Sequence, residues 1–281
     1  MRIATVLFVT AGLLAQNPKP LRSVRAGTRP VSRLYVFGDS YSDTGAGYLD
    51  GNGPTAAAYF ASRLGLKLAV PKDANANARS LNFAVSGGQT GRGAGRKVKD
   101  ALLGRGMVDQ VEDFAARVDS GAIQFAPEST LFFLAGGLND RRLKNAETVA
   151  NLKGEIRRLY QAGGRRFLVA QLPTAIPAFR EVGRRLNPDL EKIPPEMEAE
   201  LPAASVRLSH WGRFFDEVMA KPSAYGIENT KNACAGREIF NEAVNPCSRP
   251  RTYYYYHAGH PSTAVHKAVG DKMYEEFTAA R

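Results

Sequence analysis

The stretch YVFGDSYSDTG, residues 35–45, is the point from which the rest of the chain can be interpreted. Leu34–Phe37 is a run of β-prone apolar residues, which is typical of a strand buried inside a sheet. The Gly-Asp pair that follows breaks the strand and begins a turn that contains Ser40. In open α/β sheets, ligands bind at the carboxyl ends of the strands. We therefore take Ser40 as a candidate nucleophile, although Gly-Asp-Ser is also a common loop and helix-capping sequence.

The remainder of the chain alternates short apolar strands with amphipathic helices. Strand patterns occur at 34–37, 80–85, 130–134, 166–171 and 205–209, and helix patterns at 54–64, 107–118, 147–163, 211–220 and 263–279. The segment 187–201 is polar, helical in part and interrupted by Pro194-Pro195. We see no internal repeat, linker or break in composition. The pattern predicts one doubly wound, flavodoxin-like, three-layer α/β domain over 33–281, with a parallel sheet of about five strands.

The first residues have the composition of an export signal. Residues 1–15 contain one positive charge, Arg2, followed by an uncharged, mostly apolar run that ends in small residues. The alternative is a buried N-terminal helix, but the run is too short to span a bilayer and polar residues follow it. Residues 16–32 are rich in Pro, Arg and Ser and are expected to form an exposed leader. We expect a secreted or periplasmic monomer without a stable transmembrane anchor.

The two cysteines, Cys234 and Cys247, agree with an oxidising compartment. An even number of cysteines at short spacing predicts a disulfide that closes a loop. The alternative is a pair of reduced, buried thiols, which we would favour only if the protein is not exported.

The net charge of +11 favours anionic partners. The densest basic patch is Arg92–Arg105, where Arg and Lys residues lie among glycines with a single acidic residue. This patch lacks the interleaved aromatic residues of single-strand binders, and no nucleic-acid motif is present. We therefore expect a lipid or anionic polysaccharide surface, and no nucleic acid, as the partner.

Three further turn positions carry polar groups suited to chemistry. Gly87 follows the second strand pattern, Asn139 follows the third, and His260 precedes the Pro-Ser start of the last helix. Right-handed crossovers would bring the strand ends to one edge of the sheet. Acyl transfer needs such a set: a serine, a histidine that accepts its proton, and donors for the oxyanion. Backbone N–H groups of Ser40 and Gly87 with the Asn139 amide could be those donors, although Gly87 and Asn139 taken singly could equally form turns.

These residues, in this order, resemble the SGNH hydrolases, also called the GDSL esterase/lipase family. The four matching blocks are FGDSYSDTG (37–45), NFAVSG (82–87), GLND (137–140) and HAGHPS (257–262), and the resemblance extends over nearly all of the chain after the signal. The chain also looks like the secreted branch that includes esterases, phospholipases and lipid acyltransferases. The resemblance implies a carboxylic ester hydrolase with Ser40 as nucleophile, Gly87 and Asn139 completing the oxyanion hole, and His260 as base. From the residues we expect neither a cofactor nor a metal, since Pro261 and the missing carboxylate partners disfavour metal ligation by His257 and His260 and no cofactor signature is convincing.

One position departs from the family pattern. The last block normally reads Asp-x-x-His, and this chain has His257 in the aspartate position. A neutral imidazole brings no negative charge to stabilise the imidazolium of His260. A main-chain carbonyl near residue 257 could orient His260, or another acid such as Asp43 or Asp140 could reach it. In the third alternative the site is impaired and the domain binds lipid or glycan without cleaving it.

We predict an active hydrolase of short acyl, lipid or acetylated glycan esters, because the nucleophile, the base and the oxyanion donors are present. It would use a Ser40–His260 dyad with His257 in place of the usual aspartate. If His257 occupies the orienting position, His257→Asp is expected to raise turnover.

Overall fold

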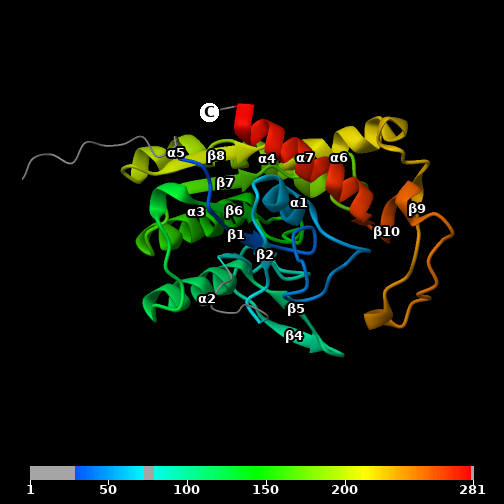
Figure 1. The fold of residues 1–281 in the computed structure, drawn as a ribbon, viewed down its shortest axis with the longest axis horizontal. Coiled ribbons are helices and arrows are strands. Elements are labelled where there is room, and N and C mark those ends of the chain that lie inside the picture. Colours follow the sequence, from blue (N-terminus) through cyan, green and yellow to red (C-terminus); the bar gives the residue numbers. More distant parts are fainter. Residues whose placement is uncertain (1–28, 73–78, 280–281) are drawn as a thin grey trace, which may run out of the picture.

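The computed structural model describes residues 29–72 and 79–279. The predicted signal peptide, 1–15, and most of the predicted leader lie outside these ranges. The centre of the fold is a six-stranded parallel sheet (Figure 1). In spatial order its strands are β2 (Leu68–Ala69), β3 (Ser80–Asn82), β1 (Arg33–Gly38), β6 (Thr130–Ala135), β7 (Arg166–Ala170) and β8 (Ser205–Ser209). The predicted doubly wound α/β fold is confirmed, with the two-residue β2 as an additional edge strand.

β1 lies in the middle of the sheet, which explains its uninterrupted apolar sequence. It pairs in parallel with β3 on one side and with β6 on the other, in a register that sets Gly38 opposite Ala135. From Leu34 onward every residue of β1 is buried, because helices cover both faces of the sheet. A Cβ at Gly38 would lie 2.5 Å from the backbone oxygen of Ala135. Glycine is therefore required where β1 ends and the turn begins.

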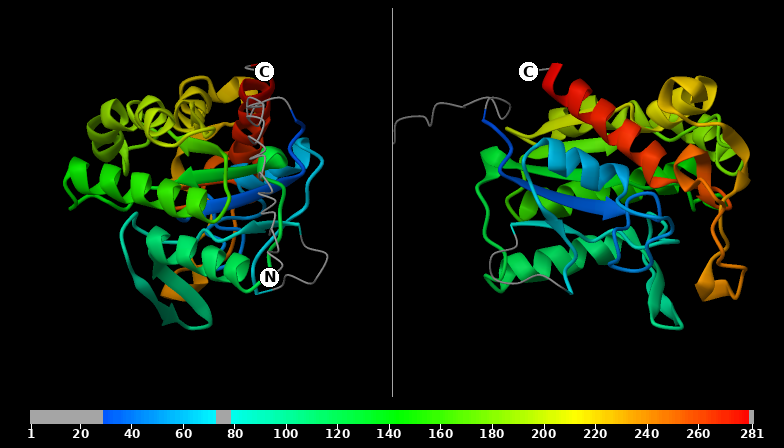
Figure 2. Two further views of the ribbon diagram at one scale, coloured as in Figure 1. Left: turned by 90° about the vertical axis from the view of Figure 1, so that its left-hand side faces the viewer. Right: turned by 45° about the vertical axis from the view of Figure 1, so that its right-hand side comes forward.

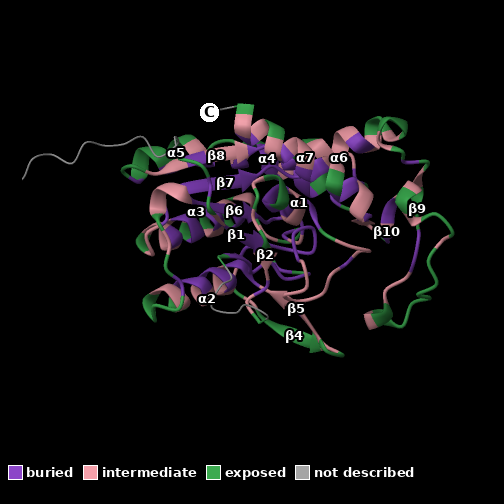
Figure 3. Ribbon diagram, viewed as in Figure 1, coloured by how far each residue is buried: buried purple, intermediate pink, exposed green. Residues whose placement is uncertain are grey.

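Helices form the two outer layers (Figure 2). On one side, α1 (Ala56–Arg63) and α6 (Trp211–Ala220) both pack against α7 (Thr263–Ala279), and on the other side α2 (Met107–Asp119) packs against α3 (Asn145–Gln161). The contacts of α3 continue to α4 (Arg180–Leu190) and α5 (Ile193–Glu200). Figure 3 shows that the central strands β1, β6 and β7 are almost entirely buried between these layers.

The polar segment 187–201 differs from its prediction. A helix starts already at Arg180 as α4, and Pro194-Pro195 lies in the first turn of α5. Proline fits the first helical turn because the N–H groups there have no partner within the helix. The two prolines therefore lie at the start of α5. The sequence prediction, which treated them only as an interruption of a helical segment, was incomplete.

Two smaller sheets and several 3-10 helices lie outside the central sheet. The basic patch forms an antiparallel hairpin, β4 (Ala94–Val98) and β5 (Ala101–Arg105). The C-terminal part forms a three-stranded sheet of β9 (Asn229–Ala233), β10 (Tyr253–His257) and β11 (His260–Pro261). Short 3-10 helices are η1 (Pro127–Ser129), η2 (Pro222–Tyr225), η3 (Glu238–Phe240) and η4 (Pro250–Thr252). Between β9 and β10 the structure contains the predicted Cys234–Cys247 disulfide. Within the two described ranges, no helix is long and apolar enough to cross a membrane.

The strand order fixes where a ligand can bind. From β1 the chain continues to β2 and β3 on one side of β1, whereas from β6, the neighbour of β1 on the other side, it continues to β7 and β8 in the opposite direction. Such a reversal leaves a crevice beyond the carboxyl ends of the two strands. The turn after β1, with Ser40, therefore lies at the switch point, flanked by the loops after β3 and β6.

Candidate active site

Ser40 lies in a tight turn two residues after β1. The carbonyl of Asp39 accepts hydrogen bonds from the N–H groups of Ser42 and Asp43, at 3.0 and 2.9 Å, and these bonds close the turn. Ser40 is 8% exposed, and its Oγ lies 2.8 Å from Nε2 of His260. Two residues 220 positions apart in the sequence are thus in hydrogen-bond contact. A serine and a histidine at this distance can transfer a proton between them.

His260 is held over the serine by contacts of its own loop. The hydroxyl of Tyr41, next to Ser40, donates a 2.7 Å hydrogen bond to the carbonyl of Gly259. Nδ1 of His260 lies 3.1 Å from the carbonyl oxygen of Ala258. Burial lowers the pKa of His260, although the charge of Asp50 opposes this effect. A neutral imidazole is the form that can accept a proton, so the environment favours a base.

The loops on either side carry the predicted oxyanion donors. Gly87 is exposed and has a φ of +78°, a conformation that favours glycine. Asn139 follows β6, and its Nδ2 donates a 2.9 Å hydrogen bond to the carbonyl of Gly88. This hydrogen bond joins the two loops. A backbone N–H and a side-chain amide from these positions are the donor types that oxyanion holes use.

Asp43 and Asp140, the two acids considered from sequence as partners of His260, form hydrogen bonds that stabilise other turns. The carboxylate of Asp43 accepts hydrogen bonds from the backbone N–H of Tyr48 at 2.9 Å and of Ser86 at 2.8 Å. Asp140 accepts from the hydroxyls of Thr90 and Thr148, at 2.5 and 2.8 Å. These bonds fix the serine loop and the asparagine loop. Within the described part of the chain, neither carboxylate forms a hydrogen bond with His260.

A different carboxylate, Asp50, lies against both histidines. It comes from the loop between β1 and α1 and is 8% exposed. Its Oδ1 is 2.7 Å from Nδ1 of His257, and its Oδ2 is 3.2 Å from Nε2 of His260. The His257 ring thus contacts the carboxylate, and the carboxylate contacts the base. Sequence analysis missed Asp50 because it lies outside the four family blocks; its one signal was an acid two residues before Asn52 in the turn DGNGP.

Arg237, from the loop closed by the disulfide, completes this cluster. Its Nε lies 3.0 and 3.1 Å from the two carboxylate oxygens of Asp50. Its Nη2 lies 2.8 Å from Nδ1 of His260 and 2.5 Å from the carbonyl oxygen of Ala258. Burial works against ionisation of Asp50, but the His257 hydrogen bond and the charges of His260 and Arg237 outweigh it and hold the pKa of Asp50 below its ordinary value. Asp50 is therefore an ionised carboxylate at neutral pH.

One known protein family matches most of this chain. The family model for GDSL-like lipase/acylhydrolase matches residues 34–273. The chain belongs to this family. As a GDSL hydrolase it is a carboxylic ester hydrolase in its reaction class.

Individual relatives of the GDSL hydrolase are distant. A GDSL esterase/lipase of Arabidopsis thaliana is 24% identical, over 95% of this chain and 88% of that protein. The thermolabile hemolysin of Vibrio parahaemolyticus is 25% identical, over 87% of this chain and 63% of that protein. Among solved structures, a lipolytic protein of the G-D-S-L family from Veillonella parvula covers 88% of this chain and 98% of its own, with a TM-score of 0.45 and 15% identity.

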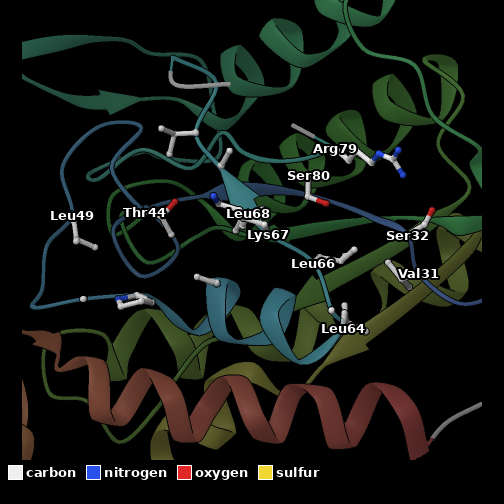
Figure 4. A pocket seen from close by; sticks show the side chains of 16 residues that line it. Val31, Ser32, Thr44, Leu49, Leu64, Leu66, Lys67, Leu68, Arg79 and Ser80 are labelled. Atoms are coloured by element: carbon white, nitrogen blue, oxygen red, sulfur yellow. The ribbon is translucent and has the colours of Figure 1, made fainter. Parts of the chain in front are cut away.

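The GDSL hydrolase also contains a cavity of about 1040 Å³ between the loop after β1 and the segment from α1 to β2 (Figure 4). Much of its lining is apolar, including Leu49, Leu64 and Leu66. Neither Ser40 nor His260 is among the described residues that line it. Among the described residues, no group of three His, Cys, Asp or Glu side chains could hold a metal ion.

The acid that precedes Ser40 has an unusual environment. Asp39 is fully buried; its Oδ1 accepts the N–H of Tyr41 at 3.0 Å, and its Oδ2 has no partner among the described residues. Burial raises the pKa of Asp39 to about 7, and the charges of Asp140 and Asp43 act in the same direction. In the unfolded chain an aspartate titrates at its ordinary value, near 4. The folded protein therefore binds a proton at Asp39 that the unfolded chain has already lost.

We expect Asp39→Asn to stabilise the GDSL hydrolase at alkaline pH. The stabilisation from protonated Asp39 is present below the unfolded pKa and is lost as the pH rises through about 7. At pH 9 the ionised wild-type side chain should cost on the order of 2–4 kcal/mol relative to acidic pH. Urea unfolding at pH 5 and pH 9 measures this, and the stability of the variant relative to the wild type should be greater at pH 9 than at pH 5. An equal difference at the two pH values would contradict the prediction.

Proposed function

We propose that this GDSL hydrolase cleaves carboxylic esters through an acyl-enzyme on Ser40, with His260 as general base. The observation that carries the proposal is the 2.8 Å contact between Ser40 Oγ and His260 Nε2. The hydroxyl proton passes to Nε2 as Oγ attacks the ester carbonyl, and the imidazolium then protonates the departing alcohol. Water, deprotonated by the same nitrogen, attacks the acyl-enzyme, and the carboxylic acid leaves as Ser40 recovers its proton.

The flanking loops supply the charge stabilisation that each tetrahedral intermediate needs. The oxyanion would accept hydrogen bonds from the backbone N–H groups of Ser40 and Gly87 and from the amide of Asn139. Two features support this assignment: the positive φ of Gly87 and the hydrogen bond that ties Asn139 to Gly88. Donors held in place before the reaction pay no reorganisation energy as the charge develops.

The carbonyl of Ala258 supports one of the alternatives left open by the sequence. When Nδ1 of His260 carries the proton, it can donate to this oxygen, 3.1 Å away. Nε2 is then unprotonated and faces the Ser40 hydroxyl. A main-chain acceptor thus selects the tautomer in which His260 can act as a base.

The surface near the site supports a lipid substrate. We define the basic rim as the β4–β5 hairpin, residues 94–105; the hairpin and the disulfide loop, residues 234–247, project from the same side of the molecule (Figure 1). They touch where Lys99 Nζ donates to the carbonyl of Glu238, at 2.5 Å. The hairpin has exposed cationic side chains, Arg96 among them, and the loop exposes Phe240 (44%) and Val244 (49%). Cations beside apolar side chains suit an anionic lipid surface better than an acetylated polysaccharide.

Export is part of the same proposal. The disulfide is typical of an oxidising compartment, and the signal pattern at 1–15 would direct the chain there. A secreted or periplasmic ester hydrolase would meet lipid headgroups at a membrane surface.

A substrate panel tests the function. The purified protein is expected to hydrolyse p-nitrophenyl acetate and p-nitrophenyl butyrate in solution, and to release fatty acid faster from phosphatidylglycerol vesicles than from phosphatidylcholine vesicles. High salt should reduce the difference between the vesicles, because it screens the basic rim. If the soluble esters are cleaved but both kinds of vesicle are hydrolysed at equal rates, the proposed lipid surface is contradicted and the proposed hydrolase activity is not. No activity on any of these esters would contradict the hydrolase.

A further inference from the structure

We propose that Asp50 is the positioning carboxylate of this active site, replacing the aspartate that His257 displaces, and that Arg237 and His257 hold it there. The inference rests on the proposed Ser40–His260 chemistry. It assigns to a loop outside the family blocks the negative charge that the last block lacks.

The position of Asp50 carries the argument. Oδ2 lies 3.2 Å from Nε2 of His260, the nitrogen that also contacts Ser40. This nitrogen gains the proton when Ser40 attacks, so positive charge appears next to an ionised carboxylate. Both the Asp50 and the His260 side chains are largely buried, at 8% and 15% exposed. A charge pair shielded from water is stronger than the same pair on the surface.

The remaining contacts explain why Asp50 does not turn away from the base. Its other oxygen, Oδ1, is engaged by Nδ1 of His257 at 2.7 Å and by Nε of Arg237 at 3.0 Å. Arg237 and His257 lie on different segments, the disulfide loop and β10, so the carboxylate is held from two directions. In this arrangement His257 is a donor to the carboxylate, and it need not itself carry the negative charge.

Arg237 has a second effect, on the tautomer of His260. A guanidinium can only donate, so its 2.8 Å contact with Nδ1 forms a hydrogen bond only when Nδ1 is unprotonated. When Nδ1 carries the proton, Ala258 accepts it and Arg237 keeps its bond to the same carbonyl. The negative charge of Asp50 offsets the positive charge of Arg237 at the imidazole ring of His260. Without the carboxylate, Arg237 would make the imidazolium of His260 harder to form.

The cluster also reverses the expected effect of a substitution at residue 257. In the present structure Nδ1 of His257 lies 2.7 Å from Oδ1 of Asp50. The substitution His257→Asp, which restores the family pattern, would place a second carboxylate next to Asp50 at this position. Like charges at this distance repel, and one of the two acids would bind a proton. We therefore expect His257→Asp to lower turnover, in contrast to the prediction from sequence alone.

The test compares pH profiles of kcat/KM for p-nitrophenyl acetate in the wild type, Asp50→Asn and Asp50→Glu. In the wild type, kcat/KM should rise with pH as His260 loses its proton. The groups that face His260 are Asp50, Arg237, His257 and Tyr41. Removing the one carboxylate among them should lower the plateau at least about tenfold and move the midpoint of the rise down by about 1 pH unit.

Asp50→Glu keeps the negative charge and should leave the midpoint of the pH profile near the wild-type value. If Asp50→Asn does not fold, the pH profile of Asp50→Glu tests the role of the carboxylate instead. Glu242→Gln is the matched control, because Glu242 also pairs with Arg237, through a 2.7 Å bond from the Arg237 N–H, and is exposed at the surface. It should change kcat/KM less than about twofold. A plateau within threefold of wild type in Asp50→Asn, or a lower plateau with an unmoved midpoint, would overturn the role of Asp50. A wild type without esterase activity would instead overturn the proposed function.

Discussion

Replacing Ser40 by Ala is expected to lower kcat for p-nitrophenyl acetate by a factor of about 10⁴ or more. The substitution removes Oγ, which lies 2.8 Å from Nε2 of His260, and leaves no atom to carry the acyl group. Alanine fits the turn, because the bonds that close it are made by the backbone carbonyl of Asp39. The fold and the melting temperature should therefore change little, and the loss should be confined to chemistry.

The chain offers a matched control in the same turn. Ser42 is fully buried two residues further on, and its Oγ has no hydrogen-bond partner among the described residues. Ser42→Ala should keep kcat within about threefold of wild type, although it removes the same hydroxyl group. Stopped-flow release of p-nitrophenol should show a burst in wild type and in Ser42→Ala, and none in Ser40→Ala. Equal rates in Ser40→Ala and wild type would assign the activity to another nucleophile.

The fold could be predicted from sequence because its signals are local. The apolar run of β1 and the alternation of strands and amphipathic helices each depend on a few neighbouring residues, and α7 begins and ends where its pattern predicted. The two-residue β2 and the β4–β5 hairpin were missed. In β4, Ala94–Val98, no residue is fully buried, so the strand has no apolar alternation to reveal it.

In the candidate site, too, some residues could be predicted from sequence and others could not. Ser40, Gly87 and Asn139 lie in turns that follow strands, and His260 lies in β11 shortly before α7, so their positions follow once the strand order is known. Asp50 and Arg237 lie in loops that are 187 residues apart in sequence, and neither loop has a repeating pattern. Their meeting depends on how the disulfide loop folds back over the sheet edge. No sequence period encodes that contact, which is why the aspartate missing at 257 could be noticed from sequence while its replacement could not.

A substitution of Asn139, in the loop after β6, gives the second large expected effect. Asn139→Ala should lower kcat by about 10²–10³, because one preorganised donor to the oxyanion is lost. The amide has a fixed orientation because its Nδ2 donates to the carbonyl of Gly88 at 2.9 Å, and the backbone carbonyl of Asn139 accepts a 3.0 Å bond from Gln89 Nε2, which holds the loop. KM should change little, because the ground-state carbonyl carries less charge than the tetrahedral intermediate and gains less from the donor.

The design separates this role from a structural one. Asn139→Asp keeps the shape but exchanges the donor for a negative charge, so it should lose more activity than Asn139→Ala at neutral pH. Asn151→Ala is the control, because Asn151 also donates through its amide, to Thr90 Oγ1 at 3.2 Å, but from helix α3. If Asn139→Ala raised KM and left kcat unchanged, the amide would bind the substrate in its ground state. The oxyanion would then depend on the N–H groups of Ser40 and Gly87, and the rate should respond to the backbone conformation at Gly87 more than to any side chain.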